Sequence, residues 1–176
     1  MPAHDVIFID TSVLTNLLSV PGLCDRAEEA KGEFERLRRA GAKFVIPVTA
    51  LIETGNHIAQ VKQGDRRGVA QRFCKAVDAA RSSSPPWTIR DVNWDDEFLV
   101  RLLSGDSTGS ALVEHLAAKT LGTGDVAILV ERDLFLEQVR VSGVRIWSYD
   151  QRLVAYNDDS RRPPSRSRKS ETNKRA

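Results

Sequence analysis

The stretch that decides the fold is Val6-Ile7-Phe8-Ile9-Asp10-Thr11-Ser12-Val13-Leu14. Its first four residues are all apolar and predict a short strand that is buried on both faces. Asp10 ends this strand abruptly, and the residues after it predict a helix, because Asp is a preferred N-cap. A buried strand that delivers a carboxylate to the start of a helix makes Asp10 the first candidate site residue.

The same pattern recurs late in the chain, where the predicted strand 144–149 leads into Asp150. Two further strands are predicted over 43–48 and 87–92. Hydrophobic periodicity and turn residues predict helices between the strands; they cover 11–19, 25–40, 49–61, 66–80, 94–103, 111–121, 125–137 and 151–156. Strands that are separated by helices predict an α/β fold with a central, mostly parallel sheet that carries helices on both faces.

Four acids are expected at one edge of this sheet. Asp10 and Asp150 follow strands, Glu53 lies one turn into the helix after the second strand, and Asp125 opens the helix 125–137. In open parallel sheets the carboxyl ends of the strands meet at one edge and form the ligand site. Crowded carboxylates repel one another, and a hard divalent cation such as Mg²⁺ or Mn²⁺ relieves that repulsion. These four acids are therefore candidate metal ligands.

Each acid also has a purely structural interpretation. Asp10, Asp125 and Asp150 stand where helices are predicted to begin, so each is a candidate N-cap that contributes about 1 kcal/mol. Glu53 is equally compatible with a solvent-facing position.

Two neighbouring residues are weaker candidates. Asp133, two turns into the helix from Asp125, is the substitute for Asp150 as the fourth acid, although we interpret it as a surface charge. His57 follows Glu53 by four residues, a spacing that places both on one helix face. Because no second His or Cys accompanies it, we interpret His57 as structural.

Length and charge predict one domain and a tail. A chain of 176 residues suits one domain, which we assign to residues 1–159. Residues 160–176 hold seven Lys or Arg and one Glu, are rich in Ser and Pro, and are expected to be a disordered basic tail. The tail is interpreted either as a nonspecific contact for nucleic acid or as a solubilising terminus.

Cys24 and Cys74 form no Cys-x-x-Cys motif and are expected to be reduced thiols. No apolar run approaches the ~20 residues of a membrane helix, and the first residues do not resemble a signal peptide. We therefore expect a cytoplasmic protein that does not enter a membrane.

Taken in order, four motifs resemble a PIN domain, and in particular the VapC-type toxins of bacterial toxin–antitoxin pairs. They are the Asp10-Thr11-Ser12-Val13-Leu14 opening, the helical Glu53, the segment Gly124-Asp125-Val126-Ala127-Ile128 and the ending Ser148-Tyr149-Asp150. The resemblance covers about residues 5–156. The interval from Asp125 to Asp150 is longer than in small VapC toxins, which indicates an insertion within 135–143.

The resemblance implies a three-layer α/β/α fold, often dimeric, and a Mg²⁺- or Mn²⁺-dependent endoribonuclease that cleaves RNA with metal-activated water. The implied metal ligands and catalytic acids are Asp10, Glu53, Asp125 and Asp150, and the hydroxyl of Ser12 would orient water or a carboxylate. A homodimer and a small antitoxin that places an Arg among the acids are the implied partners.

Arg152 and Lys119 are expected to contact phosphates beside the acids. The alternative hypothesis is a protein of the same fold that binds RNA, or acts as an adaptor, without catalysing a reaction.

Overall fold

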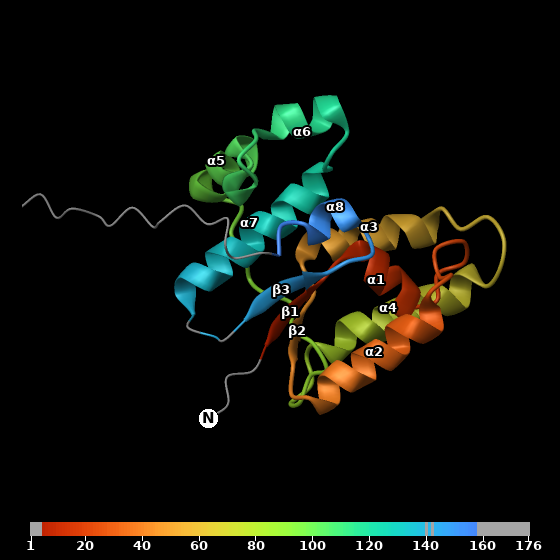
Figure 1. Ribbon diagram of the computed structural model, residues 1–176. Helices are drawn as coiled ribbons and strands as arrows, with labels where there is room; N and C mark the ends of the chain where they lie inside the picture. Colours follow the sequence, from red (N-terminus) through yellow and green to blue (C-terminus); the bar gives the residue numbers. More distant parts are fainter. Residues whose placement is uncertain (1–4, 140, 142, 158–176) are drawn as a thin grey trace, which may run out of the picture.

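The fold is built on a parallel sheet of three strands. The computed structural model describes residues 5–139, 141 and 143–157, so the predicted tail 160–176 lies outside the described residues. Strand β1 (Val6–Ile9) is central, β2 (Lys43–Val45) and β3 (Val144–Trp147) flank it, and both pairs are parallel. The predicted α/β class and the parallel sheet are thus confirmed (Figure 1).

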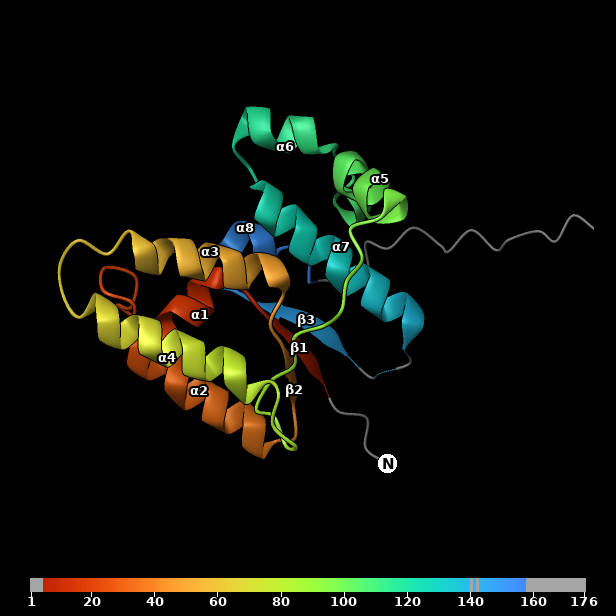
Figure 2. The same ribbon diagram turned by 180° about the vertical axis from the view of Figure 1, so that it is seen from behind.

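Helices lie on both faces of this sheet (Figures 1 and 2). The α-helices within the described residues are α1 (Thr11–Leu17), α2 (Ala27–Arg39), α3 (Val48–Ala59), α4 (Arg66–Ala79), α5 (Asp96–Ser104), α6 (Leu112–Ala118), α7 (Thr123–Gln138) and α8 (Gln151–Val154). A single 3₁₀ turn, η1 (Asp106–Thr108), joins α5 to α6.

Alternating residues of β1 define two hydrophobic cores. Phe8 packs with α7, α5 and α8 on one face, while Ile7 and Ile9 pack with α1, α2 and α3 on the other. All four β1 side chains are buried, as their continuous apolar run predicts. Because both faces are covered by helices, the polar ends of the strands are the part of the sheet that remains available for a site.

The prediction of a strand over 87–92 is wrong. Only one isolated bridge forms there, between Val45 and Thr88. The Trp87 indole N–H donates to the Ala76 carbonyl of α4 at 2.8 Å, and the Arg90 guanidinium lies over the Phe135 ring of α7, 4.7 Å from its centroid. These two side-chain anchors on different helices lead the backbone away from the sheet edge after one bridge.

The second strand is also shorter than predicted. It ends at Val45, and Pro47 rather than Thr49 is the N-cap of α3. A proline fixes φ near the value a helix entry needs and has no N–H to leave unpaired. The helix therefore begins at Val48, and Glu53 is in its second turn.

Helix α7 is the central helix of the larger core. Its residues 126–133 are all buried, including the charged side chains of Glu131, Arg132 and Asp133. Asp133 pairs with Arg132 at 2.8 Å, so the interpretation of Asp133 as a surface charge is wrong. The helix runs to Gln138 and so includes the first four residues of the segment 135–143 that the sequence marks as an insertion.

The last described residues are tied back onto the sheet. Asn157 accepts from the Ile146 N–H at 2.6 Å and donates to the Ile146 carbonyl at 2.8 Å, so its amide pairs with the free edge of β3 as a neighbouring strand would. Arg132 donates to the Tyr156 carbonyl at 2.5 Å. These contacts fix α8 and therefore Asp150, which precedes it.

Among the described residues, no helix combines the length and the apolar character that crossing a membrane requires. Cys24 and Cys74 are both free thiols, as predicted.

Glu131 and Arg90 share a polar cavity of about 150 Å³ beside α7. Glu131 is only 4% exposed, and its Oε1 and the Nη1 of Arg90 have no hydrogen-bond partner within the described part of the chain. Burial raises the pKa of the Glu131 carboxyl to about 7, against the opposing effect of the Arg90 charge. The folded protein therefore holds a proton on Glu131 more tightly than the unfolded chain does.

Glu131→Gln should make folding less dependent on pH. Because the pKa is raised in the fold, wild-type stability is fully present below pH 4.5 and falls as the pH rises to about 7. Glutamine keeps the shape and cannot ionise, so at pH 8 the variant should be more stable by up to about 3 kcal/mol. Urea unfolding at pH 4.5 and pH 8 measures this, and an equal stability difference at both pH values would contradict it.

Candidate functional site

The candidate site lies at the carboxyl ends of β1 and β3, where α1 and α8 begin (Figure 1). Asp10 directly follows β1, and its N–H donates to the Trp147 carbonyl at 3.0 Å, which extends the pairing of β1 with β3 by one residue. Asp150 stands three residues after β3 and is the N-cap of α8. Both acids therefore reach the same edge because their strands are parallel neighbours.

Asp10 is held by two serines and its own helix. Its Oδ2 accepts from the Ser12 hydroxyl at 2.6 Å, from the Ser12 N–H at 3.2 Å and from the Ser148 hydroxyl at 2.8 Å. The carboxylate is 5% exposed. All these bonds go to one oxygen, so among the described residues Oδ1 has no protein donor and is the atom available to a ligand.

The two serines also connect the strands to each other. The Ser12 hydroxyl accepts from the Tyr149 N–H and the Ser148 hydroxyl accepts from the Asp150 N–H, both at 2.9 Å. Each hydroxyl thus donates to Asp10 and accepts from the chain after β3. The resemblance implied that the Ser12 hydroxyl orients water or a carboxylate, and in the structure this hydroxyl donates to Asp10. The contact of Ser148 with Asp10 was not predicted, although Ser148 belongs to the motif that ends in Asp150.

Glu53 reaches the site from α3. Its Oε2 accepts from the Thr11 hydroxyl of α1 at 2.7 Å. Its Oε1 lies against Gly124 of α7, where a Cβ atom would come within 2.1 Å of it. A glycine is therefore required at this position for α7 to pass so close to the carboxylate.

The sequence predicted Asp125 as the first residue of its helix, whereas in the structure it is the third residue of α7. Its Oδ2 accepts from the N–H of Gly122, the N-cap residue, at 2.7 Å, which is one half of a capping box. Burial raises the pKa of the Asp125 carboxyl, and the charges of Asp10, Asp150 and Glu53 raise it further, against the effect of the Gly122 hydrogen bond. The other three predicted acids are therefore all close enough for their charges to act on Asp125.

Asp150 differs from the other three acids because it is already paired. Arg152 donates to both of its oxygens, with Nη2 at 2.8 Å from Oδ2 and Nε at 3.1 Å from Oδ1. This hydrogen-bonded guanidinium lowers the pKa of Asp150. Arg152 also donates to the Lys119 carbonyl at 3.0 Å, so the guanidinium connects α8 to the turn between α6 and α7.

The alternative fourth acid does not join this site. Asp133 is buried beside Arg132 near η1, where its charge acts on Asp106 and raises the pKa of that carboxyl together with burial. His57 lies one turn after Glu53 on α3 and lines a separate cavity. Neither residue belongs to the site formed by Asp10, Glu53, Asp125 and Asp150, which we call the acidic edge.

The residues present fit a hard divalent cation by their chemistry. Four carboxylates supply only oxygen ligands, and three of them raise the pKa of Asp125 by repulsion that a cation would reverse. The side chains are not yet arranged as a cage, because within the described ranges no three acidic, His or Cys side chains form a group close enough to hold a metal ion. In addition, Asp150 is already paired with Arg152.

Comparison of the chain with models of protein families, with curated proteins and with solved structures finds no match.

Ser148→Ala tests the hydrogen bonds that hold Asp10. The substitution removes a buried donor to a carboxylate and leaves the Asp150 N–H without its acceptor, so the free energy of unfolding should fall by about 1–3 kcal/mol. Ser104→Ala is the matched control, because the Ser104 hydroxyl is exposed and bonds only within its own helix. Urea unfolding of both variants measures the difference. Equal losses for Ser148 and Ser104 would show that the network contributes nothing to stability.

Proposed function

We propose that this chain is a Mg²⁺- or Mn²⁺-dependent endoribonuclease with a PIN-like α/β/α fold, acting as the toxin of a toxin–antitoxin pair. The observation that carries the proposal is the gathering of Asp10, Glu53, Asp125 and Asp150 at one sheet edge, where three of these charges raise the pKa of the fourth. A structural role as separate N-caps would not require the acids to be close. A cation site does require it.

Each acid has a distinct part in the proposed site. Asp10 offers Oδ1 while its Oδ2 is fixed by Ser12 and Ser148, so this ligand is oriented before a cation arrives. Glu53 is fixed by Thr11, and Asp125 by the Gly122 N–H. A bound divalent cation would activate water and offset negative charge on the scissile phosphate.

Arg152 is proposed to exchange partners during binding. In the absence of a cation it neutralises Asp150, with an ion pair whose Arg side chain is 63% exposed and therefore free to move toward solvent. If Asp150 served as a ligand of a bound cation, the Arg152 guanidinium would be available for a phosphate oxygen, which it could bind through two N–H groups. In this proposal Arg152 pairs with Asp150 when no cation is bound and with the RNA phosphate when one is bound.

The proposed partners are a second copy of the chain and a small antitoxin. Five exposed apolar residues on α5 and α6 support a protein contact there; they are Leu99, Val100, Leu103, Val113 and Leu116. Light scattering of the purified chain measures whether it forms a dimer, and the same measurement after co-expression with the product of a small neighbouring gene measures whether it binds an antitoxin. A monomer that binds no such product would remove both partners from the proposal.

The second candidate function is RNA binding without cleavage. One observation favours it: among the described residues no three acidic, His or Cys side chains lie close enough together to hold a metal ion. The two candidates differ in whether purified protein cuts RNA when Mn²⁺ is added.

Asp10→Asn should abolish Mn²⁺-dependent RNA cleavage. The amide keeps the shape of Asp10 but removes the charge that Oδ1 offers to the cation, so the cleavage rate should fall by about 100-fold or more. Asp78→Asn is the control, because Asp78 is an exposed residue of α4 that pairs with Arg81. Cleavage of an RNA panel and growth arrest on expression are the two measurements. Full activity in the Asp10 variant would contradict the proposal.

Arg152→Gln should tighten Mn²⁺ binding. The substitution removes a positive charge in direct contact with Asp150 and frees that carboxylate, so the dissociation constant should fall by about tenfold. Arg81→Gln, which breaks the exposed pair with Asp78, is the matched control and should leave Mn²⁺ binding unchanged. Titration calorimetry measures both. Unchanged binding in the Arg152 variant would mean that Asp150 is not a ligand, and weaker binding would contradict the proposed competition between Arg152 and the cation.

A further inference from the structure

A second feature lies next to the acidic edge and has no role in the chemistry described above. It is a cavity of about 630 Å³ between the end of α3 and the loop that follows α1. This volume is within the ~300–1,000 Å³ range of small-molecule sites. We call it the α3 groove, and define it by Leu23, His57, Gln60, Lys62 and Gln63.

The α3 groove continues directly from the acidic edge. His57 lies four residues after Glu53 on the same helix, so it is on the same face and about 6 Å further along the axis. Gln60 follows as the C-cap of α3. Helix α3 thus contributes one residue to the acidic edge, Glu53, and one turn later a lining residue of the groove, His57.

The charges of the groove suit a polyanion. No acidic side chain is among its lining residues, and a neighbouring cavity of about 490 Å³ shares Gln60 and Lys62 and adds Arg66. Within the described part of the chain, the side chains of His57, Gln60 and Lys62 have no hydrogen-bond or ion-pair partner. By contrast, the cavity beside Glu131 includes four acids among its lining residues.

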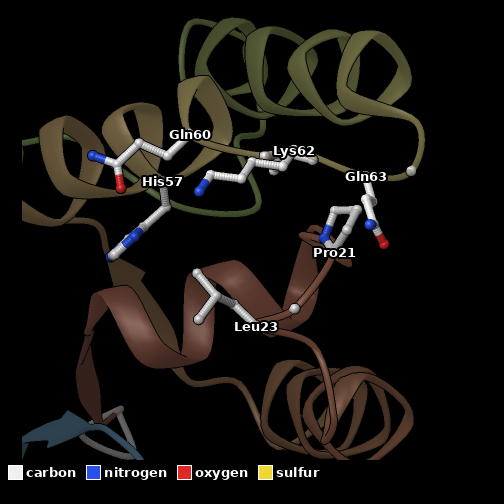
Figure 3. Close-up of a pocket in the computed structure, with 9 residues that line it drawn as sticks. Pro21, Leu23, His57, Gln60, Lys62 and Gln63 are labelled. Carbon is white, nitrogen blue, oxygen red and sulfur yellow. The ribbon is translucent and has the colours of Figure 1, made fainter.

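The side chains converge on the interior of the groove. Figure 3 shows the His57 ring, the Lys62 ammonium and the Leu23 side chain pointing into the same space from three different segments. An imidazole ring beside an apolar side chain offers a surface on which a base can stack, and an ammonium beside it can bind a phosphate. These are the two kinds of contact that a single-stranded nucleic acid makes.

The loops that form the groove are held in place. Gly64 has a φ of +95°, and a Cβ atom there would come within 3.1 Å of Pro21, so the two loops touch at the far end of the groove. Arg72 of α4 donates to the Leu18 carbonyl at 2.9 Å, which fixes the chain after α1. Because the groove is already formed, binding need not order these loops first.

We propose that the α3 groove binds the single-stranded RNA next to the scissile phosphate, with His57 stacking on a base and Lys62 binding a phosphate. This rests on the proposed function, because it takes RNA as the substrate of the acidic edge. Beyond the proposed function, the groove specifies on which side of the acids the RNA lies and which residues contact the RNA. His57, interpreted from the sequence as structural, is assigned a binding role.

The test is fluorescence anisotropy with a labelled single-stranded RNA, the full chain and EDTA, at a series of KCl concentrations. Lys62→Gln should weaken binding and lower the slope of log K against log[salt] by about 0.7, the value for one lost phosphate contact. Lys62→Arg should restore the slope. Lys75→Gln, on the exposed surface of α4, is the matched control and should leave the slope unchanged.

The stacking contact is tested in the same titrations. His57→Ala should lower the affinity by about tenfold, and His57→Phe should restore it, because a phenyl ring can also stack on a base. Photo-crosslinking with 4-thiouridine RNA should label a peptide that contains His57–Gly64. Any one of three results would overturn the proposal. They are a salt slope for Lys62→Gln equal to that of the wild type, an RNA affinity for His57→Ala equal to that of the wild type, and crosslinks only to residues 158–176.

These outcomes are separate from those of the proposed catalysis, because no metal is present and no RNA is cut. RNA cleavage that depends on Asp10 but is accompanied by unchanged binding in both groove variants would remove the groove and keep the nuclease. Weakened binding in both variants without any cleavage by the wild type would keep the groove and favour the non-catalytic candidate.

Discussion

Electrostatic repulsion among carboxylates is the constraint on which the site depends. Burial raises the pKa of Asp125, and the charges of Asp10, Asp150 and Glu53 raise it further. A fold that gathers like charges loses stability unless a cation or hydrogen bonds offset the repulsion. Here part of the compensation is internal: the serine hydroxyls on Asp10, the Gly122 N–H on Asp125 and the guanidinium of Arg152 on Asp150. The remainder is what we assign to a divalent cation.

The same interactions also connect the elements that form the edge. Ser12 and Ser148 join α1 to the chain after β3 through Asp10, and Glu53 spans from Thr11 of α1 to Gly124 of α7. The site is therefore a point where three helices and two strands are held in register, and not only a set of ligands. Asp10 and Glu53 thus accept from side chains of other segments, whereas the only side-chain partner of Asp150 in the described residues is the exposed Arg152.

The sequence predicted β1, the helical position of Glu53 and the roles of Asp10 and Asp150 at helix starts, because these depend on local periodicity and capping. It failed for residues 87–92, where the Trp87 and Arg90 side chains are anchored on helices far away in sequence. It also failed for Asp133, which is buried beside Arg132 where α7 packs against η1. The α3 groove was not predicted, because it joins segments that are far apart in the sequence. The Arg152–Asp150 pair is local, but the sequence analysis assigned Arg152 to phosphate contacts instead.

The central claim is that the acids at the sheet edge form one cation site, which the α3 groove extends toward RNA. Calorimetric titration with Mn²⁺ of the wild type and of the double variant Asp10→Asn, Asp125→Asn tests this claim most directly. The account predicts one saturable binding event in the wild type that is lost in the double variant while the fold is kept. Equal Mn²⁺ binding by the two proteins, or none by either, would contradict it.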